Sequence, residues 1–469
     1  MSCAMDEAAS NISPSCPECD RLRQRVAQLE ATVAQLEQRL GNHSGNSSIP
    51  PSANPPHAPR PKPKAPSKRR RGGQPGHQGH SREKIPPERV DAFIDHVPEA
   101  CSRCRAPLPA GARPHDPPPT WHQVIDLPPS VLVVTEHRGQ ARTCPACGEV
   151  TRAAIPEAIA DHVAGPRLTA FLSYLVGRHH ASRRGVGELV EALGARLSLG
   201  TIGNLEREVA SALGTPHAEA ADHVRQAEAK NGDETGWKLA GARRWLWAVA
   251  TATVAYFLIH ARRGRVGLDA AMGETRIGVM TSDRWGAYGS WPLERRQICW
   301  AHLIRDFQKC VDRGGPSESL GQAGLAVARS LFDAWKEFGD RSIDREGLKR
   351  RLAPLRERLR ADLEGTRASP DRKVSTFATN LLNLEPALWL FGELDGVEPT
   401  NNHAERVLRR GVLWRKNAFG SSSESGCRFA ERMLTVVQTL RLQGRPVLDY
   451  LTEAVRAHRH GQPAPKLVP

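Results

Sequence analysis

The sequence lacks any apolar run long enough to cross a bilayer. Its longest run, Trp245 to Ile259, has 15 residues and is interrupted by Thr251 and Thr253, whereas a transmembrane helix needs about 20. Only 39% of the residues are hydrophobic and the mean hydropathy is -0.47, which excludes an integral membrane protein. The N-terminus also has no apolar stretch, so no secretory signal is visible. We expect a cytoplasmic protein with no membrane contact.

Acidic residues are too few to balance the basic ones. There are 51 Asp and Glu against 66 Lys and Arg in 469 residues, a formal charge of +15, and the isoelectric point is near 9.7. A surface this basic is typical of proteins that bind a polyanion, most often nucleic acid. At roughly 100–200 residues per domain, the length allows two to four domains.

Disulfides are not expected in a reducing compartment, although the chain has ten cysteines. Six of them form C-x-x-C pairs, a spacing typical of metal ligands. We predict that Cys101, Cys104, Cys144 and Cys147 hold one structural Zn²⁺ in a finger over residues 90–152, because the metal can replace a core that this segment lacks. Two β-rich runs between the pairs, residues 121–127 and 131–137, are predicted strands.

The remaining pair, Cys16 and Cys19, has no partner pair nearby. It could be half of a site shared between subunits or an idle pair, and the sequence leaves both open.

Residues 22–40 carry a heptad repeat. The apolar positions are spaced by four and three residues: Leu22, Val26, Leu29, Val33, Leu36 and Leu40. Valine at one seam position with leucine at the other favours a parallel two-stranded coiled coil, and thus a homodimer or higher oligomer. The alternative is an amphipathic helix packed on its own chain.

A linker rich in proline and serine follows and becomes strongly basic. From Arg60 to Lys84, nine Lys or Arg face a single acid. A flexible basic arm can follow phosphates or enter a minor groove, so we expect Lys68, Arg69, Arg70 and Arg71 to contact DNA and the protein to be nucleoid-associated. The alternative is a solvated tail.

Later segments alternate between helical and strand patterns. Helices at 187–193 and 201–213, separated by Gly194, fit a helix-turn-helix as well as plain helical packing. Strands are predicted at 244–250, 253–260, 276–282 and 297–300. Residues 302–395 read as largely helical, as do 402–416 and 426–442.

Three acids stand at distinctive positions. Asp233 lies where the strand section begins, Asp283 directly follows an apolar strand, and Glu405 opens a late helix. Glu405 also has a structural alternative, because Asn402 as N-cap would place it at the capping-box position.

An Asp on a first strand, an Asp after a fourth strand and an acid on a late helix is the chain order of a ribonuclease-H-like metal site. Three carboxylates can hold two Mg²⁺ or Mn²⁺ ions about 3.5–4 Å apart for phosphoryl transfer. Nearby cations would hold the DNA: Arg406, Arg409, Arg410, Arg415 and Lys416.

With these features together, the sequence resembles bacterial DDE transposases of the insertion-sequence-66 family. The resemblance is carried by the heptad segment, the linker motifs at 46–52 and 72–77, the four cysteines, and the motifs at 233–237, 299–302 and 400–406. It implies that Asp233, Asp283 and Glu405 are the catalytic triad and that the helices between the last two are an insertion. It also implies accessory transposition proteins.

We therefore predict a multidomain α/β protein with a ribonuclease-H-like catalytic core. The expected parts are a coiled-coil helix (20–41), a linker with basic arm (42–89), a zinc finger (90–152), a helical DNA-binding region (160–226), the core (227–301 and 397–445), a helical insertion (302–396) and a C-terminal tail (446–469). The predicted function is a DNA transposase that cleaves insertion-sequence ends and transfers their 3′ strands into target DNA with Mg²⁺. The alternatives are a non-catalytic zinc-finger regulator and a ribonuclease-H-like nuclease without strand transfer.

Overall fold

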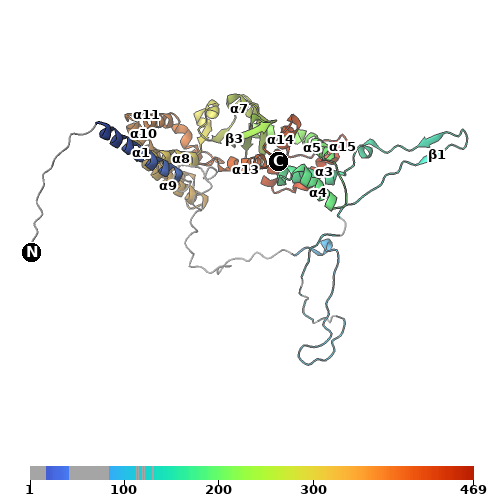
Figure 1. The fold of residues 1–469 in the computed structure, drawn as a ribbon. Coiled ribbons are helices and arrows are strands. Elements are labelled where there is room, and N and C mark those ends of the chain that lie inside the picture. Colours follow the sequence, from blue (N-terminus) through green and yellow to red (C-terminus); the bar gives the residue numbers. More distant parts are fainter. Residues whose placement is uncertain are drawn as a thin grey trace, which may run out of the picture. The chain divides into compact units, whose positions relative to one another are not determined.

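The computed structural model describes residues 17–41, 84–111, 114, 116–118, 120, 122–128 and 131–469 (Figure 1). The chain forms two compact units, one of residues 62–136 and one of residues 1–61 with 137–469. The predicted basic residues Lys68, Arg69, Arg70 and Arg71 lie outside the described residues, as does Cys16. Across the described part of the chain, no helix is both long and apolar enough to cross a membrane.

The described residues of the smaller unit have little regular secondary structure. It contains the 3₁₀ turn η2 (Pro87–Arg89) and an isolated bridge between Ala100 and Pro107. The strands predicted at 121–127 and 131–137 are wrong, since no strand forms over the described residues 122–128 and 131–137. Strand propensity reflects packing on a pleated surface, and apolar side chains such as Val133 (94% exposed) pack against nothing here.

In the larger unit, α1 (Pro17–Gly41) confirms the predicted helix. Its heptad positions from Leu22 to Leu36 are about half exposed. A short antiparallel hairpin, β1 (Ala141–Thr143) with β2 (Val150–Arg152), flanks the third cysteine pair.

Between β2 and the main sheet lie five helices: α2 (Glu157–Ala160), α3 (Pro166–His179), α4 (Arg183–Ala192), α5 (Leu199–Ala212) and α6 (Gly214–Gln226). The predicted helix pair is confirmed as α4 and α5. Ser198 caps α5, because its Oγ accepts a bond from the backbone N–H of Thr201 at 3.0 Å. Gly194 turns between the helices with φ of +94°, a conformation that glycine adopts without strain.

The main sheet has five strands: β3 (Ala229–Leu239), β4 (Ala242–Ala250), β5 (Ala255–His260), β6 (Val279–Ser282) and β7 (Arg296–Ile298). Their order in space is β5-β4-β3-β6-β7. The first three pair antiparallel as a meander, and β6 and β7 then add in parallel to β3. Helix α7 (Arg265–Met272) makes the crossover from β5 to β6. The strands predicted from the sequence are present with shifted ends.

Three late helices complete this part: α13 (Asn402–Ala418), α14 (Glu424–Leu442) and α15 (Val447–Arg459). Helix α13 packs on β3 and β4, and α14 on β5. At Gly411 the backbone of α13 comes so close to the sheet that an added Cβ would lie 2.3 Å from a methyl carbon of Leu246.

Helix α14 also closes the open edge of the sheet at β5. The backbone N–H groups of Ala255, Phe257 and Ile259 donate to side chains of α14, at 3.1, 3.0 and 2.5 Å. The acceptors are Thr439, Thr435 and Glu431. Four residues of helix advance about 6 Å and two residues of strand about 6.8 Å, so the two ladders match. The backbone N–H groups on this edge of β5, which would otherwise lack partners, are therefore hydrogen-bonded.

Residues between β7 and α13 form a helical block, whose hydrophobic core also includes Val279 of β6 and Ile298 of β7. Its members are α8 (Trp300–Arg313), η5 (Gly315–Ser317), α9 (Glu318–Gly339), α10 (Arg345–Arg367), α11 (Arg372–Asn383), η6 (Glu385–Leu388) and α12 (Leu390–Glu393). The predicted helical character of residues 302–395 is confirmed.

Candidate active site

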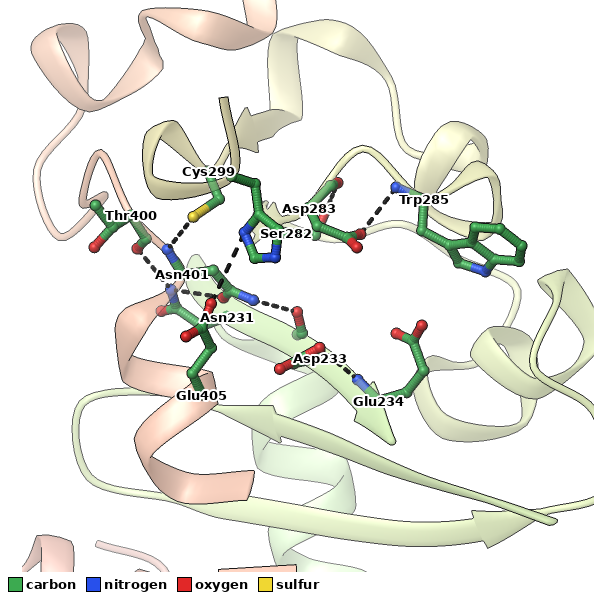
Figure 2. Close-up of polar contacts among 12 residues, drawn as sticks. Asn231, Asp233, Glu234, Ser282, Asp283, Trp285, Cys299, Thr400, Asn401 and Glu405 are labelled. Carbon is green, nitrogen blue, oxygen red and sulfur yellow. Dashed lines mark hydrogen bonds and ion pairs between the residues drawn. The ribbon is translucent and has the colours of Figure 1, made fainter. Parts of the chain in front are cut away.

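The parallel pairing of β3 with β6 places Asp233 and Asp283 at the same level. Asn231 pairs with Thr281 in this ladder, and each aspartate lies two residues further along its chain. Side chains two apart share a face of a sheet, so both carboxylates leave the same face. Figure 2 shows Asp233, Asp283 and Glu405 projecting into one region from β3, the loop after β6, and α13.

Glu405 is held in place by the residue that precedes its helix. Asn401 is 1% exposed, its side-chain Nδ2 donates to the carbonyl of Gly232 at 2.7 Å, and its Oδ1 accepts from Asn231 at 3.3 Å. Its backbone N–H points at the sulfur of Cys299, 3.1 Å away. Asn401 therefore joins the start of α13 to β3 beside Asp233 (Figure 2), a role that the sequence analysis missed.

The capping-box alternative for Glu405 is wrong. Asn401, not Asn402, is the N-cap of α13, and its side chain makes no capping bond. Glu405 is therefore one position beyond the capping-box site, and its carboxylate is available to the candidate site.

Electrostatic contacts link the three acids. Burial, together with the negative charges of Glu234, Glu405 and Asp283, raises the pKa of Asp233 to about 8, although the backbone N–H of Glu234 opposes this shift. That N–H donates to Asp233 Oδ1 at 2.8 Å, and the N–H of Trp285 donates to Asp283 Oδ1 at 2.9 Å. Carboxylates crowded in this way repel one another, and a cation bound among them would offset that repulsion.

This donor set fits a hard divalent cation, since all three residues offer carboxylate oxygens. However, the three carboxylates do not form a group whose ligand atoms all lie within 4.8 Å of one another. Among the described residues, that closeness is reached by Cys299, His302 and Glu405.

Glu234, next to Asp233 on β3, lies on the opposite face of the strand. Its side chain is 1% exposed, and Arg263 Nε lies 2.9 Å from its Oε1. Tyr288 donates its hydroxyl to the other carboxylate oxygen at 2.9 Å. These bonds commit Glu234 to the interior of the protein.

The predicted DNA-binding cations on α13 differ in what they contact. Arg406, Arg409 and Lys416 are exposed, and Arg410 is half-buried. Arg415 reaches back to the sheet, where its Nη1 donates to Thr235 Oγ1 at 3.0 Å and to the carbonyl of Gly236 at 2.7 Å. Arg415 thus fastens α13 to β3.

The two cysteine pairs predicted to bind zinc have the same local geometry. In each pair, the backbone N–H of the first cysteine donates to the carbonyl of the residue five positions later in the sequence. The carbonyl of that cysteine accepts from the N–H of the residue four positions later. That fourth residue has positive φ in both, 64° at Arg105 and 80° at Gly148. Backbone N–H groups of each turn lower the pKa of its first thiol. For Cys101 these are the N–H groups of Cys104 and Arg103, and for Cys144 they are those of Cys147 and Ala146. The pairs belong to different units, so the four-thiolate site stays a prediction.

Residues 161–428 match the model of the Transposase IS66 family. The protein belongs to this family. Membership confirms the resemblance seen in the sequence. Residues 5–83 match a family of unknown function.

One curated relative is an uncharacterized protein, y4qI, from Sinorhizobium fredii. It is 24% identical over 209 residues, which cover 40% of this chain and 38% of the relative. The chain thus matches well under half the length of that relative.

Proposed function

We propose that this IS66-family protein binds the ends of its insertion sequence, cleaves them at the 3′ strand and joins the freed 3′-hydroxyls to target DNA. The observation that carries the proposal is the register of β3 and β6, because it sets Asp233 level with Asp283 while Asn401 holds Glu405 beside them. The strand order, with one antiparallel meander and two added parallel strands, supports a ribonuclease-H-like core.

In this proposal the three carboxylates hold Mg²⁺ or Mn²⁺. When bound, the metal would lower the pKa of the attacking water or hydroxyl and balance charge on the phosphate. Exposed Arg406 and Arg409, on the same helix as Glu405, are placed to bind the DNA backbone near the acids. Asn401 and Arg415 keep that helix seated on β3.

The other parts serve DNA binding and pairing. We propose that α1 pairs with α1 of a second copy through its exposed heptad positions, which would hold two ends in one complex. We also propose that the two matching cysteine turns share one structural Zn²⁺, and that α4 and α5 with the basic arm contact end sequences. The proposal also includes accessory transposition proteins, because the family resemblance implies them.

The test is a joining assay with purified full-length protein, labelled end DNA, a plasmid target and Mg²⁺. We expect joined product from the wild type and none from Asp283→Asn, with end binding by the variant unchanged in a mobility-shift assay. Cleavage without joined product would favour the nuclease alternative. Binding without cleavage under any divalent metal would favour the regulator.

A further inference from the structure

Cys299, His302 and Glu405 bring three different metal-binding groups together beside the acids. The sulfur, a ring nitrogen and a carboxylate oxygen all lie within 4.8 Å of one another. Cys299 directly precedes α8 as its N-cap, His302 lies in the first turn of that helix, and Glu405 lies in the first turn of α13. The two helix starts are tied together, because the N–H of Trp300 donates to the carbonyl of Pro399 at 2.9 Å.

The imidazole of His302 has an unused ligand atom facing this cluster. Its Nδ1 is buried without a hydrogen-bond partner and lies 3.8 Å from Glu405 Oε1, too far for a hydrogen bond. Ligand atoms of one tetrahedral zinc ion lie about 3.4 Å apart, given bond lengths near 2.1 Å. A shift of about 0.4 Å would therefore bring both atoms onto one ion.

The surroundings of Cys299 also suit a bound thiolate. Burial raises the pKa of the Cys299 thiol to about 11, but two features would stabilise a thiolate bound to a metal. The sulfur stands at the start of a 14-residue helix whose dipole favours negative charge, and the N–H of Asn401 points at it from 3.1 Å (Figure 2). Backbone donors of this kind orient and stabilise metal ligands from outside the coordination sphere.

Sulfur, nitrogen and oxygen donors together select zinc rather than magnesium, which takes oxygen ligands. We propose that Cys299, His302 and Glu405 form a second metal site that takes Zn²⁺ with one position open, and that zinc there inhibits the enzyme by withdrawing Glu405 from Asp233 and Asp283. Binding replaces the thiol proton, which is released to solvent. The inhibitory half rests on the proposed function, whereas the binding half does not.

Binding is tested with Co²⁺, whose bond to a thiolate gives a near-ultraviolet charge-transfer band. Full-length protein is first saturated with one equivalent of Zn²⁺ per four-cysteine site and then titrated with Co²⁺. We expect the band in the wild type and in Cys310→Ser, a matched control that removes another buried thiol of α8. Cys299→Ser and His302→Ala should lose the band or need at least about tenfold more Co²⁺. His302→Ala is included because the His302 side chain is 29% exposed and its loss disturbs the core less. If Cys299→Ser and His302→Ala both give a Co²⁺ band as strong as that of the wild type, the proposed site is overturned.

Inhibition is tested in the joining assay at fixed Mg²⁺ with increasing Zn²⁺, and each variant is normalised to its own zinc-free rate. We expect half-inhibition of Cys299→Ser to need at least about tenfold more Zn²⁺ than that of Cys310→Ser. Equal inhibition of the two variants overturns the inhibitory half. If no variant joins DNA at all, the proposed function fails, while the Co²⁺ titration still decides whether the metal site exists.

Discussion

Replacing Asn401 by alanine should damage catalysis far more than DNA binding. The change removes the bonds to Gly232 O and from Asn231 Nδ2, and leaves a buried carbonyl without its donor. An unsatisfied buried group costs about 1–3 kcal/mol and a lost bond about 1 kcal/mol, so the free energy of unfolding should fall by about 2–4 kcal/mol. Since a misplacement of about 1 Å can cost roughly 10²-fold in rate, strand transfer should fall by about that factor.

The neighbouring Asn402 provides the matched control. It is exposed, so Asn402→Ala should change stability by less than about 0.5 kcal/mol and leave joining near the wild-type rate. Urea unfolding gives the stability, the joining assay gives the rate, and a mobility shift gives end binding. The reasoning is refuted if Asn402→Ala is the more damaging change, as the capping pattern in the sequence would have it, or if Asn401→Ala joins DNA at the wild-type rate.

Three further changes test other parts of the structure. Gly411→Ala should destabilise the protein by about 1–3 kcal/mol, because the new methyl group meets Leu246. As a control, a methyl group added by Gly365→Ala in α10 meets nothing within 4 Å, so that change should be neutral or stabilising by up to about 1 kcal/mol. Equal shifts of the melting temperature in the two variants would contradict the close packing of α13. Burial raises the pKa of Glu431 to about 7, so the folded state binds its proton more tightly than the unfolded state, and this stability is present below about pH 4.5 and lost as the pH rises through 7. Glu431→Gln should remove that part of the pH dependence between pH 5 and 8 in urea unfolding, and an unchanged profile would count against it. Finally, the zinc content of the purified protein, measured by metal analysis, should fall by one ion per chain in Cys101→Ser and in Cys144→Ser. An unchanged zinc content in either variant would argue against a shared four-thiolate site.

Much of the sheet was predictable because its strands are strongly patterned. Aromatic and β-branched runs indicated β4 and β5, and the apolar stretch before Asp283 indicated β6. The same reasoning failed at the described residues 122–128 and 131–137, where β-branched side chains such as Val124 and Val134 are largely exposed. Propensity alone does not supply a partner strand.

Asn401 escaped prediction because its role is made by tertiary contacts. A polar residue before a helix is interpreted as its N-cap. The adjacent Asn401 and Asn402 were both candidates for that position, and the sequence analysis chose Asn402. Only the approach of α13 to β3 shows that the side chain of Asn401 bonds to Gly232.

The polar residues that close the sheet edge did leave a signal. Glu431, Thr435 and Thr439 recur every four residues along α14, a helix whose other positions there are mostly apolar and buried. Such a stripe indicates that buried donors lie opposite it. The grouping of Cys299 and His302 with Glu405 left a signal in the C-x-x-H spacing only, since the third member comes from a distant segment.

The central claim is that Asp233, Asp283 and Glu405 serve one metal site. It is tested most directly by Mn²⁺ binding to the protein–end-DNA complex, followed by electron paramagnetic resonance, for Asp233→Asn, Asp283→Asn, Glu405→Gln and their double variants. Each single change should weaken Mn²⁺ binding by at least about tenfold, and each double change should cost much less than the sum of its two single changes, because groups that share a site do not act independently. Wild-type affinity in the single variants, or strictly additive losses in the doubles, would contradict the account.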